Sequence, residues 1–584
     1  MGEAVGLAGR PVAVDFDGVL AEMMKHALVA DEAGEAADHA LAPANLNRLG
    51  AAVHDREPAI LGVEIGDRIR LAIVAVTGVL GDEVGERETI FEHHAHRRYS
   101  PAAARFRRTV ATGCGNGRGG AAMTTSEITT FAIDGFDGSL MHPFDPGYDE
   151  ARRVFNGMID RYPAVIARCT SADDVAAVVR MAQRERLELT VRAGGHGVSG
   201  SAVADDAVCC DLRGMKGITI DPMARTARVE AGVLWGELDA ATQEHGLAVT
   251  GGRVSSTGVA GLVLGSGSGW IERSFGFTCD NLISAEVVTA DGRQVVASER
   301  ENPGLFWGLR GGGGNFGIVT AFHFNLAPLG PIVLGGMLVY PASIAGDVVR
   351  FYRDFMATAP DALGTGLTFF TAPPADYVPV PVRGHPVVGI ICCYTGSPAD
   401  GEEAVRPLRE FGPPPAIDMI QPMPYVAVQQ LLDAGNPSGL QNYWSADFLA
   451  ELPDEAVDTL VALATKPVSA LSQIVLVAGG GAVARVPSSA TALGERTAPW
   501  NIRYLSLWAD LAATERNIAY TKSISASMKP WTTGRVYLNY IGDEGHGRVA
   551  AAFGPEKYAR LAALKKVWDP TNVFRHNQNI PPAE

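Results

Sequence analysis

The chain has 584 residues, of which 47 % are hydrophobic and 20 % are charged, so its composition is that of a folded globular protein and not of a disordered one. The length predicts more than one domain, because single hydrophobic cores seldom grow beyond about 250 to 300 residues. The formal net charge of −16 argues against a nucleic-acid binder or a polybasic membrane-surface protein, since both need an excess of Lys and Arg. Small-molecule chemistry is favoured.

The cysteines and the N-terminus both favour a cytoplasmic protein. The 7 cysteines include two adjacent pairs but no CxxC motif, which argues against a disulfide framework and against a zinc site. No apolar run approaches the roughly 20 residues of a membrane span, and the N-terminus lacks the basic and apolar regions of a signal peptide. We therefore expect neither a membrane nor a nucleic acid as partner.

Residues 1 to about 125 differ in texture from the rest of the chain and are rich in Ala, Gly and Arg. An apolar run ends there in Asp15-Phe16-Asp17-Gly18, which resembles the first motif of haloacid-dehalogenase-like phosphatases. In that family the first Asp is the nucleophile and the second is the general acid/base. The Ser or Thr, the Lys and the acidic pair that this chemistry also needs have no evident place in the residues that follow. A strand ending in an Asp-Gly turn is the favoured interpretation.

A histidine cluster and a change of texture follow. His93, His94 and His96 have no acidic or Cys partner at metal-ligand spacing, so we predict a solvated segment and no metal site. The sequence becomes orderly after Met123, and we hypothesise that the functional protein starts near that residue. Peptides from residues 1–120 in the natural protein would contradict this hypothesis.

From Tyr148 onward, helical and strand patterns alternate, which predicts an α+β protein. Ser171 followed by Asp174 is typical of a helix N-cap, because both side chains can bond free backbone N–H groups. The predicted helices span 149–159, 175–186, 234–244, 346–356 and 556–567. The predicted strands span 164–167, 187–191, 208–212, 218–221, 226–231, 282–290, 295–296, 318–324, 333–340, 367–371, 387–394 and 535–540.

Three glycine-rich segments interrupt these elements, at 190–201, 250–270 and 305–317. Glycine lets the backbone approach a bulky ligand and aim its N–H groups at phosphate oxygens, so the segments predict a nucleotide cofactor. The second segment is too rich in small residues for a packed helix or a long strand, and we expect a ligand to fill the space. A GxGxxG lies in the third, but the strand, helix and acidic residue of a nicotinamide-binding fingerprint are absent.

Four motifs, in order, carry a resemblance to a known family. They are RAGGH at 192–196, TGVAGLVLGSGSGW at 257–270, FGFTCDNL at 275–282 and FWGLRGGGGNFGIVT at 306–320. Together they resemble the FAD-linked oxidases related to berberine bridge enzyme, which share the flavin fold of vanillyl-alcohol oxidase and p-cresol methylhydroxylase (PCMH). The resemblance runs from about Asp149 to the C-terminus and leaves the first 125 or so residues outside it.

The resemblance implies a fold and a domain plan. We expect an α+β chain with a two-subdomain PCMH-type FAD-binding domain at 145–330 and a second α+β domain, an antiparallel sheet with helices, at 331–530. The second domain would bind the substrate. A berberine-bridge-like segment at 531–584 would return to the flavin, and residues 1–125 would be an N-terminal extension.

The resemblance also implies site residues. His196 corresponds to the histidine that is joined covalently to the 8α carbon of FAD, and Val254 stands where some relatives carry a second linking cysteine, so one link is expected. Tyr540 and Tyr537 are equal candidates for the catalytic base, and a nearby cation must lower the pKa of such a phenol from about 10. The other expected FAD-binding residues are Arg192, Ala193, Gly194, Gly195, Gly197, Val198, Ser199, Thr257, Gly258, Gly261, Gly265, Gly267, Gly269, Asn577 and Asn579.

These expectations predict a FAD-dependent oxidase that takes hydride from an alcohol or amine carbon of a small organic substrate and passes the electrons to molecular oxygen, giving hydrogen peroxide. A flavin dehydrogenase with another acceptor is the near alternative. A phosphatase fused to a flavoprotein, and a flavoprotein that only binds its ligand, are the alternatives from other classes. The substrate and the oligomeric state are not predicted.

Overall fold

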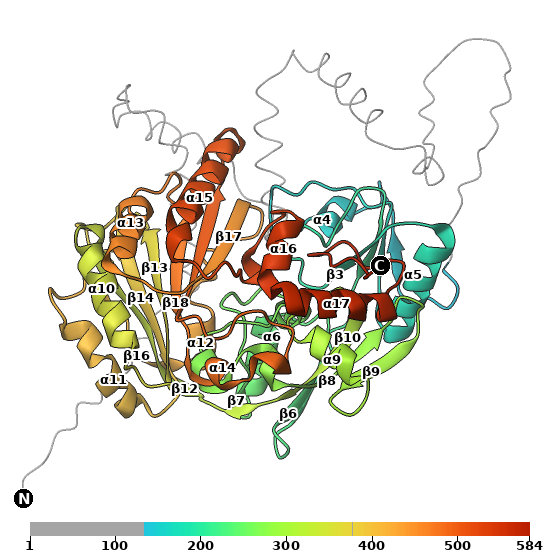
Figure 1. The fold of residues 1–584 in the computed structure, drawn as a ribbon, viewed down its shortest axis with the longest axis horizontal. Helices are drawn as coiled ribbons and strands as arrows, with labels where there is room; N and C mark the ends of the chain where they lie inside the picture. The colour runs from blue at the N-terminus through green and yellow to red at the C-terminus, as the bar shows by residue number, and fades with distance from the viewer. Residues whose placement is uncertain (1–132, 377) are drawn as a thin grey trace, which may run out of the picture. The chain divides into compact units, whose positions relative to one another are not determined.

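The computed structural model describes residues 133–376 and 378–584, and these belong to one unit of packed elements (Figure 1). The Asp15-to-Gly18 motif, the histidine cluster at 93–96 and Met123 lie outside the described residues. Among the described helices, none is long and apolar enough to cross a membrane.

The first sheet is mixed and four-stranded, in the order β1-β2-β4-β3. Strand β1 (Ser139–Met141) is antiparallel to β2 (Val165–Arg168), whereas β2, β4 (Val208–Asp211) and β3 (Leu189–Arg192) run parallel. Helix α5 (Ala172–Glu185) connects β2 to β3, and Ser171 and Asp174 form the expected capping box at its start. Strand β3 therefore delivers the chain directly into the glycine-rich loop that contains His196.

The first predicted helix is shorter than its spacing suggested. Helix α4 (Tyr148–Arg152) ends well before Ile159, because the next residues bond to distant segments instead of to their own helix. The backbone N–H of Phe155 donates to the carbonyl of Gly195, and the Asn156 side chain donates to the carbonyls of Val198 and Asn442. These bonds fix Phe155 beside the His196 loop.

The second sheet is antiparallel and five-stranded, in the order β5-β6-β10-β8-β9. Its strands are β5 (Ile218–Asp221), β6 (Thr226–Glu230), β8 (Leu282–Val288), β9 (Gln294–Ser298) and β10 (Ile318–Asn325). The helices and 3-10 turn of this region are α6 (Trp235–Gln243), α7 (Val259–Leu264), α8 (Glu272–Phe275), α9 (Pro303–Leu309) and η5 (Thr278–Asn281). The glycine-rich segment 250–270, for which we expected no packed helix, contains the short helix α7. Val259 and Val263 bury one side of it, and only six residues are helical.

The third sheet is eight-stranded and follows the small pair β7 (Leu247–Ala248) and β11 (Ala327–Pro328). Its order is β15-β12-β14-β13-β18-β19-β17, with β16 beside β12, and every neighbouring pair is antiparallel. Its strands are β12 (Ile332–Pro341), β13 (Leu363–Thr371), β14 (Pro386–Tyr394), β15 (Ile417–Asp418), β16 (Gln421–Pro424), β17 (Gln441–Leu449), β18 (Gln473–Ala478) and β19 (Trp500–Trp508).

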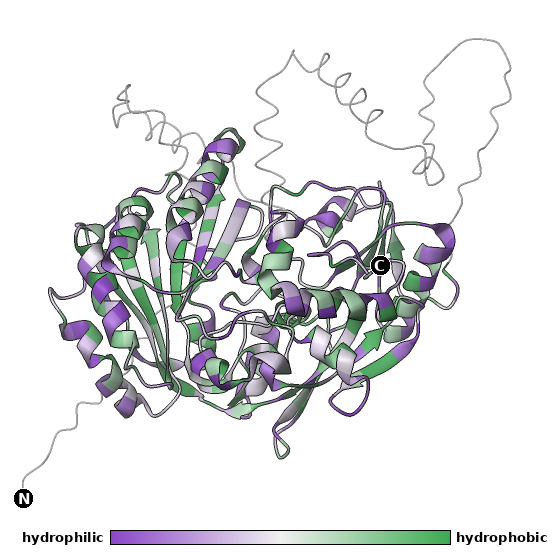
Figure 2. Ribbon diagram, in the orientation of Figure 1, coloured by the Kyte–Doolittle hydropathy of each residue, from purple (hydrophilic) through white to green (hydrophobic). Residues whose placement is uncertain are grey.

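The two faces of this sheet have different neighbours. Helices α10 (Ala345–Met356), α11 (Pro398–Glu410), α13 (Asp454–Ala464) and α15 (Thr514–Met528) share a hydrophobic core with one face (Figure 1). Figure 2 shows the strands as largely hydrophobic and the outer helices as mixed. Because side chains alternate along a strand, residues such as Arg503 and Leu505 of β19 point away from these helices. That second face is turned toward the glycine-rich loops. Two short α-helices, α12 (Tyr425–Gln429) and α14 (Gly481–Arg485), also lie between strands of this sheet in the sequence.

The C-terminal segment packs on the hydrophobic core of the first two sheets. Helices α16 (His546–Phe553) and α17 (Pro555–Trp568) follow the 3-10 turn η10 (Leu538–Tyr540), which replaces the strand expected at 535–540 because Tyr540 N–H donates to the carbonyl of Tyr537. On α17, Leu561 is buried and Tyr558 and Leu564 pack on the core. Val567 is 73 % exposed, so its place on the predicted apolar face was wrong. It lies at the helix end, beyond the core.

Candidate active site

A cavity of about 290 Å³ lies between the glycine-rich loops and the second face of the eight-stranded sheet. Loop residues 193–202, 252–265 and 313–319 form one wall, and Trp444, Val475 and Leu505 form the apolar part of the other. Residues 538–541, 574 and 576–578 of the C-terminal segment also line it. Three parts of the chain that are far apart in sequence therefore meet at one cavity.

Two of the glycine loops touch backbone to backbone. A Cβ on Gly194 would lie 2.4 Å from the backbone nitrogen of Gly258, and a Cβ on Gly258 would lie 2.5 Å from that of Gly194. Any side chain at either position would separate the loops. At Gly261 a Cβ would meet nothing within 4 Å, so the missing side chain leaves the cavity wall open there. The loops thus offer a long ligand a wall of bare backbone.

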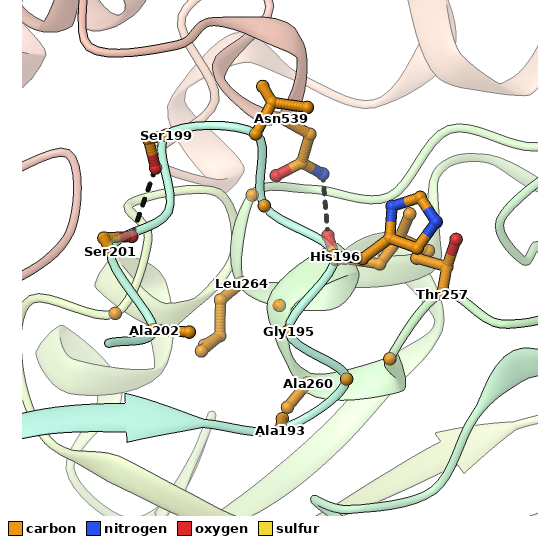
Figure 3. Close-up of a pocket in the computed structure, with 18 of the residues that line it drawn as sticks. Ala193, Gly195, His196, Ser199, Ser201, Ala202, Thr257, Ala260, Leu264 and Asn539 are labelled. Carbon is orange, nitrogen blue, oxygen red and sulfur yellow. Dashed lines mark hydrogen bonds between the residues drawn. The ribbon is translucent and has the colours of Figure 1, made fainter. Parts of the chain in front are cut away.

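His196 projects from the first loop toward Thr257 (Figure 3). Its ring stacks on Phe155 with centroids 3.8 Å apart and an angle of 17° between the planes. The Nε2 atom is buried and has no hydrogen-bond partner, and burial lowers the pKa of the imidazole to about 4. The ring is therefore neutral at physiological pH. A neutral imidazole with a free nitrogen is the form that can attack an electrophilic carbon.

A cluster of polar side chains lies in the opposite part of the wall. The Arg503 guanidinium donates to the Tyr540 hydroxyl over 3.2 Å, to Ser268 Oγ over 2.8 Å and to Asn501 Oδ1 over 2.8 Å. The Arg253 guanidinium donates to the same Ser268 oxygen over 2.7 Å. Trp444 stacks on the Tyr540 ring with centroids 5.7 Å apart. The Tyr540 hydroxyl is thus held beside a positive charge in the cavity wall.

The second candidate base lies elsewhere. Tyr537 is buried, and its hydroxyl accepts a hydrogen bond of 3.1 Å from Ser266. Burial raises the pKa of this phenol, which disfavours the phenolate that a base requires. Tyr537 lines a separate hollow of about 30 Å³, which Arg503 also borders, and not the large cavity. The structure therefore separates two tyrosines that the sequence left equivalent.

Most of the expected FAD-binding residues line the cavity. Those that do are Ala193, Gly194, Gly195, His196, Gly197, Val198, Ser199, Thr257, Gly258, Gly261, Gly265 and Asn577.

Arg192, Gly267, Gly269 and Asn579 do not line it. Arg192 instead donates to the carbonyls of Ala151 and Arg153, which supports the loop from behind. Gly267 and Gly269 allow close packing, since a Cβ there would lie 2.1 Å from Thr278 Oγ1 and 2.2 Å from the Gly251 oxygen, respectively.

Several lining residues carried no signal in the sequence. Trp444 and Arg503 belong to no motif that we singled out for the site, and Arg253 and Asn539 lie within such stretches but were given no role. Asn539 donates to the carbonyl of Leu262 over 3.0 Å (Figure 3), and a Cβ on Gly265 would lie 1.7 Å from its oxygen. Asn539 lies between the two candidate bases Tyr537 and Tyr540, and this position is the sequence feature that could have indicated it.

The cavity suits a flavin dinucleotide. It offers bare backbone for a pyrophosphate, apolar and aromatic walls for a ring system, and an unpartnered nitrogen on His196. Comparison with known proteins agrees with this fit. Residues 163–298 match the family described as "FAD binding domain", and residues 536–581 match "Berberine and berberine like".

Individual relatives and solved structures point the same way. The chain is 31 % identical over 476 residues to the (R)-6-hydroxynicotine oxidase of Paenarthrobacter nicotinovorans, a match that covers 79 % of this chain and 99 % of the relative. It is 27 % identical to an FAD-linked oxidoreductase of Bacillus subtilis, over 76 % of this chain and 97 % of the relative.

The crystal structure of 6-hydroxy-D-nicotine oxidase from Arthrobacter nicotinovorans matches with a TM-score of 0.69 and 29 % identity, covering 77 % of this chain and 98 % of that one. A berberine bridge enzyme-like protein of Physcomitrella patens shares the fold, with a TM-score of 0.69 and 21 % identity, over 77 % of this chain and 98 % of that one. The chain therefore belongs to the berberine bridge enzyme-like FAD-linked oxidoreductases, with the PCMH-type fold and FAD as its cofactor.

Proposed function

We propose that this enzyme oxidises an alcohol or amine carbon of a small organic substrate and returns its electrons to molecular oxygen as hydrogen peroxide. The observation that carries the proposal is the Tyr540 hydroxyl, which lies in the wall of the FAD cavity and accepts a hydrogen bond from Arg503. Bound FAD would supply the hydride acceptor, its N5 atom.

Tyr540 would act as the base. Removal of hydride from a carbinol or amine carbon leaves a positive centre unless the O–H or N–H proton also departs, so a proton acceptor is required. The Arg503 guanidinium carbon lies 4.3 Å from the centre of the Tyr540 ring, and its N–H bonds the phenolic oxygen. This hydrogen bond would hold the phenolic oxygen in position to take the proton. Trp444 holds the ring in place by stacking.

The glycine loops and His196 would hold the cofactor. Backbone N–H groups of residues 193–201 and 258–261 would contact the pyrophosphate, and Asn577 would lie near the flavin ring. Asn577 donates to the carbonyls of Gly314 and Phe574, which ties the C-terminal segment to the third glycine segment. His196 would form one covalent bond to the 8α carbon, since its imidazole is neutral and has a free buried nitrogen. With Val254 in the cavity wall, no second link is expected.

The relatives support an oxidase. The (R)-6-hydroxynicotine oxidase, whose length this chain covers almost completely, is named for transfer of electrons from an organic substrate. Its substrate is not carried over, because the walls of the substrate side come from Trp444, Val475, Arg503 and Leu505, and none of these belongs to a family motif.

Two measurements on purified protein test the proposal. A panel of alcohols and amines is added without oxygen, and a substrate is recognised by bleaching of the visible absorbance of the oxidised flavin. Air is then admitted. One hydrogen peroxide per substrate oxidised supports the oxidase. Bleaching that reverses only with an added dye or quinone would identify a dehydrogenase instead, and a flavin that no alcohol or amine bleaches would contradict the proposal.

A further inference from the structure

The charged residues of the cavity wall are all basic. Among the described residues that line it, Arg253, Arg503, His196 and His576 are the titratable nitrogen bases, and no Asp or Glu is present. His576 already has a partner, the Glu188 carboxylate at 2.7 Å. The pKa of His196 is lowered to about 4, so this ring is uncharged. Arg253 and Arg503 are therefore the charged side chains among the described residues of the lining.

These two charges are incompletely balanced by the protein. Arg503 is 3 % exposed, and in the described part of the chain no carboxylate oxygen lies within the 4.0 Å of an ion pair from it. Arg253 is 6 % exposed, and its nearest carboxylate oxygen, on Glu272, is 3.6 Å away. The other oxygen of Glu272 accepts from the Gly269 N–H. Burying a charge without a close partner is unfavourable, so an anion beside these side chains would be stabilised.

The guanidinium groups also have N–H donors to spare. A guanidinium carries five of them, and Arg503 uses three, on Asn501, Tyr540 and Ser268. Arg253 uses two, on Ser268 and Gly269, and its buried Nε has no partner. Both groups bond the one Ser268 oxygen, so they lie next to each other. Paired guanidinium forks are suited to bidentate binding of a carboxylate.

We propose that Arg253 and Arg503 select a substrate that carries a carboxylate, and that the enzyme discriminates against protonated amines. This inference rests on the proposed function and narrows its substrate class to organic acids with an oxidisable alcohol carbon. Trp444, Val475 and Leu505 provide an apolar surface for the body of such a substrate. A protonated amine would meet two like charges and no carboxylate in the wall.

The competing arrangement is that the protein and its cofactor already balance the charges of the pair. It predicts no preference for an anionic ligand. The two arrangements differ in a binding experiment that needs no turnover. Oxidised, FAD-loaded protein is titrated in chloride-free buffer with benzoate, with benzamide, which has nearly the same shape and no charge, and with benzylamine, which is a cation. Binding is followed by calorimetry and by the flavin spectrum.

The proposal predicts that benzoate binds at least tenfold more tightly than benzamide and that benzylamine binds most weakly. Arg253→Met should reduce the preference for benzoate over benzamide at least tenfold, and Arg253→Lys, which keeps the charge, should retain part of it. Arg228→Met is the matched control, because Arg228 pairs with Glu286 on the second sheet and does not line the cavity. Flavin content and the unfolding temperature report whether each variant is folded.

Equal affinities for benzoate and benzamide, tighter binding of benzylamine, or no binding of benzoate would overturn the proposal in the unmutated protein, whatever the variants do. The binding experiment and the test of the proposed function can fail independently of each other. If benzoate is preferred but no alcohol or amine bleaches the flavin, the anion site stands and the oxidase fails. If neutral alcohols bleach the flavin and benzoate has no advantage, the oxidase stands and the anion site fails.

Discussion

Tyr540 and Arg503 meet through a hydrogen bond of 3.2 Å from the guanidinium to the phenolic oxygen, although one lies in the C-terminal segment and the other on strand β19 of the large sheet. Tyr540 and Arg503 both line the FAD cavity, whereas Tyr537 does not. This contact joins the large sheet to the C-terminal segment. It also places a cation beside Tyr540, the base that we propose.

Tyr540→Phe should slow flavin reduction by substrate about 10²- to 10⁴-fold, because the ring and its stacking on Trp444 remain while the proton acceptor is lost. The rate is measured by anaerobic stopped-flow absorbance. FAD content should be unchanged. Tyr537→Phe is the matched control and should cost less than tenfold. A larger loss of rate in Tyr537→Phe than in Tyr540→Phe would show that Tyr537 is the base and would contradict the assignment of Tyr540.

Gly194→Ala should strongly lower the amount of FAD that copurifies with the protein. The new Cβ would lie 2.4 Å from the backbone nitrogen of Gly258, and backbone cannot move aside as a flexible side chain can, so the two cofactor loops must separate. The ratio of flavin to protein absorbance measures the effect. Gly412→Ala is the control, since a Cβ there meets nothing within 4 Å on an exposed loop. Equal flavin content in both variants would show that the close contact between the loops at Gly194 and Gly258 is not needed to hold FAD.

Covalent attachment of FAD to the apoprotein should be insensitive to pH over most of the range in which the protein is folded. Attachment needs the unprotonated imidazole, so it is lost as pH falls through the pKa of His196. Burial lowers that pKa to about 4. The rate of appearance of protein-bound flavin in a denaturing gel should therefore be level from about pH 8 to about pH 5, since an exposed histidine titrates near 6.5. A midpoint close to 6.5 would show that the ring is exposed to solvent before it reacts.

Lys565→Met should destabilise the protein by about 3–5 kcal/mol, because it leaves the Asp569 carboxylate buried without its cation. Both side chains are fully buried, and the Lys565 ammonium also donates to the carbonyls of Asn315 and Phe574. Burial lowers the pKa of this lysine, but the carboxylate at 2.6 Å opposes the shift. The midpoint of thermal unfolding is the measurement. Lys566→Met, at the exposed neighbouring position, should change stability by less than about 0.5 kcal/mol.

The sequence predicted the parts of the site that depend on local backbone chemistry. Strand β3, the loop around His196 and helix α5 follow from an apolar run, a set of glycines and the Ser171 cap, all of which act within a few residues. The family resemblance, which the comparisons confirm, added FAD and the fold. These features could be predicted because few other residue types can occupy such glycine and helix-cap positions.

Contacts between distant segments could not be predicted in this way. Arg253 and Arg503 share the Ser268 oxygen only because the large sheet packs against the second glycine loop. Helix α4 ends at Arg152, not at Ile159, because the Asn156 side chain bonds to Val198 and Asn442. The local sequence pattern does not predict these distant partners. The position of Tyr540 in the cavity and of Tyr537 outside it depends on the same packing. The charge of the cavity wall is a property of the assembled fold.

The most direct test of the account is the state of the flavin in the purified protein. The protein is precipitated with acid, the colour of the pellet is recorded, and the mass of the peptide that contains His196 is measured after proteolysis. The account predicts a yellow pellet and a His196 peptide heavier by one FAD. Yellow colour that passes into the supernatant, with an unmodified peptide, would contradict the covalent link, and a colourless protein that cannot be reconstituted with FAD would contradict the assignment as a whole.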